Sequence, residues 1–113
     1  MRGAHVSTVA VVRCTSYHPC DVDAALRRGI DLLGGVARFA RPRESIVLKP
    51  NLLVGRDPKR AVTTHPSVFR GVAQLLTEAG ARLSYGDSPG FGRTEAAARR
   101  SGIDEVARAL SIP

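Results

Sequence analysis

Residues 46–66 have the sequence Ile-Val-Leu-Lys-Pro-Asn-Leu-Leu-Val-Gly-Arg-Asp-Pro-Lys-Arg-Ala-Val-Thr-Thr-His-Pro. The first three residues predict a short buried strand, which delivers Lys49, Pro50 and Asn51 to its carboxyl end. Pro66 fits the first turn of a helix, because that position needs no backbone N–H. The connection between these two elements is much longer than the usual ~2–6 residues, and loops of that length tend to be functional. We therefore expect a site here.

The rest of the chain repeats the alternation of strand and helix. Apolar runs predict strands at Ser7–Cys14, Ser45–Leu48 and 82–86. Helical periodicity predicts a helix after Asp21, a second one from Pro66, and an Ala-rich helix from Thr94 that breaks at Gly102. The apolar positions of the first helix form one stripe, which consists of Val22, Leu26, Ile30 and Leu33.

Alternation of this kind predicts an α/β fold with right-handed crossovers. We expect a three-layer βαβαβα arrangement, in which helices cover both faces of a mostly parallel sheet of about three strands. In such a sheet the polar loops at the carboxyl ends of the strands share one edge, where ligands gather. Those loops are residues 14–21, 49–64 and 87–93.

The length of 113 residues fits one domain or part of one. The chain stops soon after a helix, where the alternation calls for a further strand, so we expect residues 1–113 to be the amino-terminal part of a single α/β domain. An exposed sheet edge would then favour a homo-oligomer, or would leave a remnant that folds poorly.

The formal net charge of +7 suits nucleic acid, a membrane surface or an anionic ligand. The basic residues, however, are scattered in pairs at most, which favours a solvated charge over a nucleic-acid footprint. The longest apolar run near the amino terminus, Val9–Val12, is too short for a signal peptide or a membrane span. These features predict a cytoplasmic protein with no membrane partner.

Two cysteines, Cys14 and Cys20, have neither the spacing of a zinc site nor that of a redox Cys-x-x-Cys pair. The three histidines, His5, His18 and His65, are scattered and give no metal-ligand spacing either. We therefore predict no metal site from these residues.

An anion site is the main functional prediction. Lys49 offers a compact positive charge for a phosphate or carboxylate, and Asn51 can orient either group. Thr63, Thr64 and His65 add side-chain donors at a helix start, where free N–H groups and the helix dipole favour anions. The competing interpretation is that Thr64 only caps the helix.

Two residues are candidates for catalysis. His65 could act as a general acid or base, because the ordinary pKa of histidine lies near neutrality. Asp87 follows a strand and precedes a Gly-rich turn, where α/β enzymes place functional carboxylates. Ser88 is a further ligand-binding candidate, although Asp87 and Ser88 are as well explained by a capped turn. The glycines match neither a dinucleotide fingerprint nor a P-loop.

Four ordered motifs resemble the domain of unknown function 362 family of prokaryotic proteins. The motifs are Val47-Leu48-Lys49-Pro50-Asn51-Leu52, Ala61-Val62-Thr63-Thr64-His65-Pro66, Gly86-Asp87-Ser88-Pro89-Gly90 and Ser101-Gly102-Ile103. The resemblance implies an α/β domain, longer than this chain, that is often associated with iron–sulfur clusters. The motif arrangement is also loosely similar to the amino-terminal domain of nickel-dependent lactate racemases.

This chain departs from the cluster-binding members, because it lacks a closely spaced cysteine run and two cysteines cannot hold a cubane. The cofactor is therefore left unknown, and whether the chain is an enzyme stays open. The leading hypothesis is an α/β domain that binds a small anionic ligand or cofactor together with a further carboxyl-terminal part. The alternatives are a redox or isomerase-type enzyme that uses a cluster or metal from that part, and a basic nucleic-acid-binding domain.

Overall fold

The computed structural model describes residues 6–88 and 93–113. The helices and strands follow in the order α1 (Pro19–Leu32), β1 (Ser45–Leu48), α2 (Pro66–Glu78), β2 (Arg82–Tyr85), α3 (Thr94–Arg100) and α4 (Ile103–Ala109). Short 3₁₀ turns lie at Val36–Arg38 and Pro58–Arg60. The predicted order from the first helix onward is confirmed, and so is the break at Gly102.

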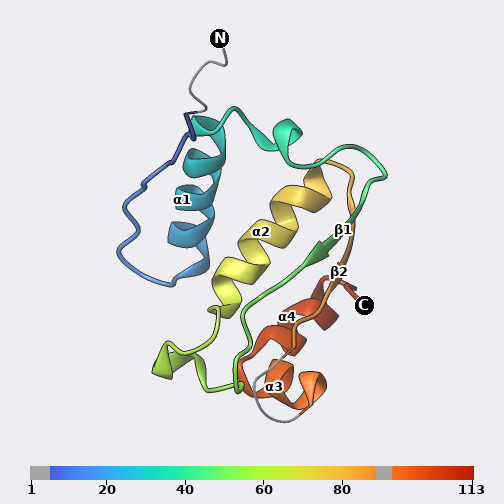
Figure 1. The fold of residues 1–113 in the computed structure, drawn as a ribbon. Coiled ribbons are helices and arrows are strands. Elements are labelled where there is room, and N and C mark those ends of the chain that lie inside the picture. The colour runs from blue at the N-terminus through green and yellow to red at the C-terminus, as the bar shows by residue number, and fades with distance from the viewer. Residues whose placement is uncertain (1–5, 89–92) are drawn as a thin grey trace.

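The two strands are parallel, and Ser45 pairs with Arg82 at one end and Leu48 with Tyr85 at the other. Helix α2 packs on this pair, as Figure 1 shows. Buried residues form two neighbouring clusters. One joins the loop after β1 to α2, α3 and α4 and contains Leu52, Phe69, Ala73, Ala97, Ala98, Ile103, Ala107 and Ile112. The other contains Ala40, Leu76 and Ala81, against which Ile46 and Leu83 pack.

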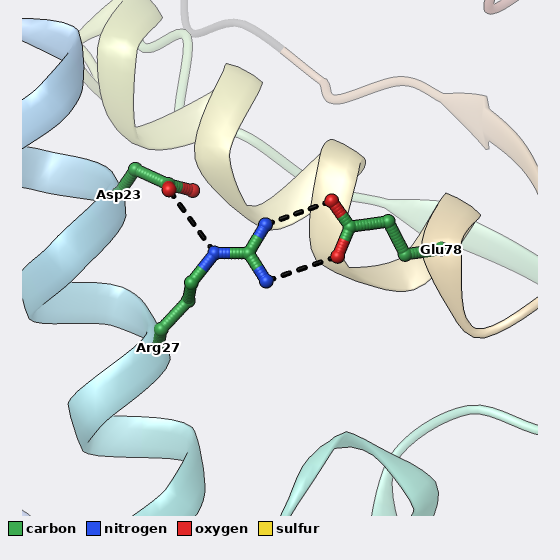
Figure 2. Close-up of polar contacts among 3 residues, drawn as sticks. All are labelled: Asp23, Arg27 and Glu78. Atoms are coloured by element: carbon green, nitrogen blue, oxygen red, sulfur yellow. Dashed lines mark hydrogen bonds and ion pairs between the residues drawn. The ribbon is translucent and has the colours of Figure 1, made fainter.

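Helix α1 lies beside α2, and the Arg27 side chain bridges the two helices. The Arg27 guanidinium donates two hydrogen bonds, of 2.9 and 2.8 Å, to the two carboxylate oxygens of Glu78 on α2 (Figure 2). Its Nε also donates to Asp23, one turn earlier on α1. The forked geometry makes this pair directional, although water screens it because Arg27 and Glu78 are both substantially exposed.

The predicted strand at Ser7–Cys14 is not formed. This segment is extended but unpaired, and it lies beside α1, apart from β1 and β2 (Figure 1). The described sheet therefore has two strands rather than about three. A β-branched run predicts extended backbone, but a strand also needs an edge to pair with, and within residues 6–88 and 93–113 no strand pairs with this segment.

Coverage of both sheet faces is not confirmed either. Ile46 and Leu48 point toward the helices, whereas Val47 points to the opposite face and is 70% exposed. The α/β class with a parallel sheet holds, but the three-layer arrangement is not what the described residues form. None of the helices described has the length and apolar character needed to cross a membrane.

Candidate functional site at the strand ends

The carboxyl ends of β1 and β2 meet at the Asp87 carboxylate. One oxygen of Asp87 lies 2.8 Å from Lys49 Nζ, which follows β1. The other oxygen accepts a hydrogen bond of 2.9 Å from the backbone N–H of Leu52. Both strands therefore end at a single carboxylate, whose side chain is only 4% exposed. Parallel pairing of β1 with β2 is what brings these residues together.

Lys49 lies at the surface of this arrangement. Its side chain is 66% exposed, and its Nζ also donates to Asn51 Oδ1 at 3.1 Å. The ammonium thus has two fixed acceptors and a third N–H available for a further partner. The structure brings Lys49, Asn51 and Asp87 together, as the sequence predicted for strand-end residues.

The pKa of the Asp87 carboxyl is held below its usual value. The largest cause is the hydrogen bond from Lys49, and the backbone N–H groups of Leu52 and Ser88 add to it. Asp87 is therefore a carboxylate at neutral pH and serves as a fixed acceptor for the lysine. A general acid would need the opposite shift.

The far end of the long loop returns to the same place through Thr64. The backbone N–H of Asn51 donates to Thr64 Oγ1 at 3.0 Å, and the N–H of Thr64 donates to the carbonyl of Asn51 at 3.1 Å. These two bonds hold the entry and the exit of the loop side by side. Thr64 therefore fastens the loop and is not the cap of α2.

His65 is the cap of α2. Its Nδ1 accepts a hydrogen bond of 3.1 Å from the N–H of Ser67, so the neutral ring carries its proton on Nε2. Burial lowers the pKa of His65, which favours this neutral form. The ring stacks on Tyr17, with centroids 4.0 Å apart and planes inclined by 7°. Ser67 Oγ also donates to the Tyr17 carbonyl at 2.7 Å.

The remaining predicted residues are more peripheral. Thr63 is buried, and its hydroxyl lies 3.5 Å from the Arg56 carbonyl within the loop. Ser88 is exposed and uses its backbone N–H toward Asp87. The other residues of the predicted Gly-rich turn, 89–92, lie outside the described residues.

Two residues that support the site are not predicted from the sequence. Leu52 is fully buried and anchors the long loop in the core, but the loop has no periodicity that would reveal it. Tyr17 reaches the start of α2 from the loop before α1, a contact between residues 48 positions apart that no local pattern predicts. Even without a first strand, the three predicted polar loops thus approach the same region.

The long loop after β1 also packs against α3. Gly55 has φ +64° and lies so close to Ala97 that a Cβ would overlap the backbone there. Arg100 donates to the Val54 carbonyl at 3.2 Å. Only glycine fits this approach.

The cysteines do not fit an iron–sulfur cluster. Cys14 and Cys20 are both exposed, and the Cys14 thiol donates to the Ser16 carbonyl at 3.2 Å. A cubane takes four thiolates, and the sequence has two. Within the described ranges, no three His, Cys, Asp or Glu side chains gather as metal ligands would.

Comparison with known proteins places this α/β chain in a family. The family described as "Domain of unknown function (DUF362)" matches residues 46–113, which begin at β1 and include the whole strand-end site. The chain belongs to this family, and the predicted resemblance is confirmed.

One relative is the "Thylakoid-associated protein sll1697" of Synechocystis sp. (strain ATCC 27184 / PCC 6803 / Kazusa), 41% identical over 108 residues. That match covers 96% of this chain and 34% of the relative. The chain therefore spans about a third of the length of this curated relative. No solved structure matches the chain.

Proposed function

We propose that Lys49, Asn51 and Asp87 form one wall of a binding site for a small anionic ligand, a phosphate or a carboxylate. The observation that carries this proposal is the fixed but exposed ammonium of Lys49. Two acceptors hold it at the strand ends, and its side chain is 66% exposed. A positive charge in a preset position loses little side-chain freedom when it binds an anion.

Each neighbouring residue then has a distinct role. Asp87 is a positioning residue, because its carboxylate holds the Lys49 ammonium at the strand ends. Asn51 offers its amide N–H groups to the ligand while its oxygen accepts from Lys49. His65 contributes the N–H on Nε2 as a hydrogen-bond donor, because its Nδ1 is already engaged. Thr64 holds the two ends of the long loop together at Asn51. We place Thr63 and Ser88 at the edge of the binding site.

The Asp87 carboxylate beside Lys49 affects which anions can bind. Asp87 offsets much of the Lys49 charge, so a ligand with a single weak negative charge gains little from the pair. The basic side chains of the neighbouring loop, Arg56, Lys59 and Arg60, add positive potential on the same connection. We therefore expect inorganic phosphate or a dicarboxylate to bind better than a monocarboxylate.

The test compares the only two lysines in the sequence. Inorganic phosphate and malonate are titrated by calorimetry into the parent protein, Lys49→Gln and Lys59→Gln. We expect Lys49→Gln to lose at least about tenfold in affinity, which corresponds to about 1.4 kcal/mol, and Lys59→Gln to lose about twofold or less. Equal affinities in the two variants, or no saturable binding by the parent protein, would refute the site.

A further inference from the structure

Val22 of the α1 apolar stripe is buried, but the other three residues of the stripe lie outside the two buried clusters. Neither buried cluster includes Leu26, Ile30 or Leu33. These residues, with Val22, line a cavity of about 600 Å³, and Leu26 also lies close against Gly71 of α2. A helix with a strong apolar stripe is stable only when that stripe is covered. The described residues cover it in part.

The opposite wall of this cavity is the extended segment at residues 7–14. Ala10 and Val12 of the segment face α1, and the Val12 side chain approaches Gly29. Val9 and Val11 face the other way and are 79% and 90% exposed. The cavity also reaches Val68 on α2.

The segment has the backbone of a strand without its hydrogen bonds. Across the described residues, no backbone hydrogen bond joins residues 7–14 to β1 or β2, and the segment belongs to no sheet. An unpaired β-branched run of this length presents free N–H and C=O groups along its edge, which another strand can satisfy. A small apolar ligand would fill the cavity but would leave these groups unpaired.

We propose that this cavity, bounded by residues 7–14 and the α1 stripe, is the docking slot for a β-strand from the remaining part of a full-length family protein. The strand would pair with the edge of residues 7–14, and its apolar side chains would pack under α1 against Leu26, Ile30 and Leu33. The curated relative aligns with 96% of this chain and has about two thirds of its length outside the alignment, which supplies a source for such a strand.

The slot also explains the failed prediction of a first strand. An inserted strand would separate residues 7–14 from β1, so the two would belong to one sheet without being neighbours. In Figure 1 residues 7–14 lie on the far side of α1 from β1, so the two are not neighbours. Sequential strands pair or neighbour in only about two thirds of cases, so an insertion breaks no topological rule.

Amide hydrogen exchange tests the proposal in three proteins. The first is this chain alone, the second is the intact Synechocystis relative, and the third is a chimera in which this chain replaces the aligned 108 residues of the relative. We expect the amides of residues 7–13 to exchange almost freely in the chain alone. In the chimera, and at the aligned positions of the relative, exchange should slow by at least about 100-fold.

Two lysine substitutions on α1 provide the matched pair. Ile30 faces the slot, whereas Leu32, two residues along the helix, is 55% exposed. In the chimera, Ile30→Lys should remove most of the protection at residues 7–13, and Leu32→Lys should leave it. In the chain alone, both variants should keep the helicity of the parent, because neither Ile30 nor Leu32 belongs to a buried cluster.

Two results would overturn the proposal. One is free exchange at residues 7–13 in both the chimera and the intact relative. The other is strong protection in the chain alone together with sedimentation as a dimer, which would show that a second copy fills the slot.

Discussion

Leu52 makes the long loop part of the core, and its truncation gives a quantitative test of that role. The side chain is 0% exposed and packs in the cluster that joins α2, α3 and α4. Four members of that cluster, Ala73, Ala97, Ala98 and Ala107, are alanines, which have no rotamers that could fill a vacated space. We therefore expect Leu52→Ala to fall in the upper part of the usual range, at about 3–5 kcal/mol of unfolding free energy.

The neighbouring Leu53 is the matched control. It has the same side chain in the same loop, but it is 50% exposed and lies in no core cluster. Its φ of +51° strains leucine and alanine alike, so Leu53→Ala changes little besides the exposed side chain. The expected change in unfolding free energy is within about 0.5 kcal/mol.

Urea unfolding followed by circular dichroism measures both variants. With a slope of about 2 kcal/mol per molar urea, Leu52→Ala should lower the midpoint by about 2 M. Leu53→Ala should leave the midpoint nearly unchanged. If Leu52→Ala cost less than about 1 kcal/mol, or if the two variants unfolded alike, the loop would not be anchored as described.

Three further predictions concern the site and its supports. Gly55→Ala should destabilise the protein by at least about 2 kcal/mol in the same urea assay, because alanine is strained at positive φ and its Cβ would overlap the Ala97 backbone; an unchanged midpoint would contradict the docking of the loop on α3. Because the pKa of His65 is lowered in the folded state, stability should fall as pH drops below the ordinary histidine value of about 6.5. His65→Asn keeps a capping side chain for Ser67 and should lack that part of the pH dependence, so identical pH profiles would contradict the cap. Asp87→Asn should weaken phosphate binding, since it frees the Lys49 ammonium from its fixed position; unchanged affinity in the folded variant would remove Asp87 as a positioning residue.

Short-range sequence patterns correctly predicted β1 and α2. Ser45–Leu48 and Pro66–Glu78 are found where the apolar run and the helix-start proline indicate them. Strand-end residues Lys49 and Asp87 meet because parallel strands share an edge, which is a property of the fold class and follows from sequence alone.

The failures have a common cause in contacts between distant residues. The run at residues 7–14 has the composition of a strand, but pairing depends on what lies beside it, and no sequence pattern shows that. The helix predicted after Asp21 begins earlier, at Pro19, and His18 caps it by accepting a hydrogen bond from the Cys20 N–H. His65, which also precedes a proline, caps α2 in the same way, so a histidine before a proline marks both helix starts.

Lysine-selective NMR can detect anion binding at the strand ends through Lys49 itself. Protein labelled with ¹³C at lysine Cε gives two signals, from Lys49 and Lys59, because the sequence has no other lysine. On titration with inorganic phosphate, we expect a saturable shift of the Lys49 signal and little shift of the Lys59 signal. Equal, non-saturating shifts of both signals would contradict binding at Lys49.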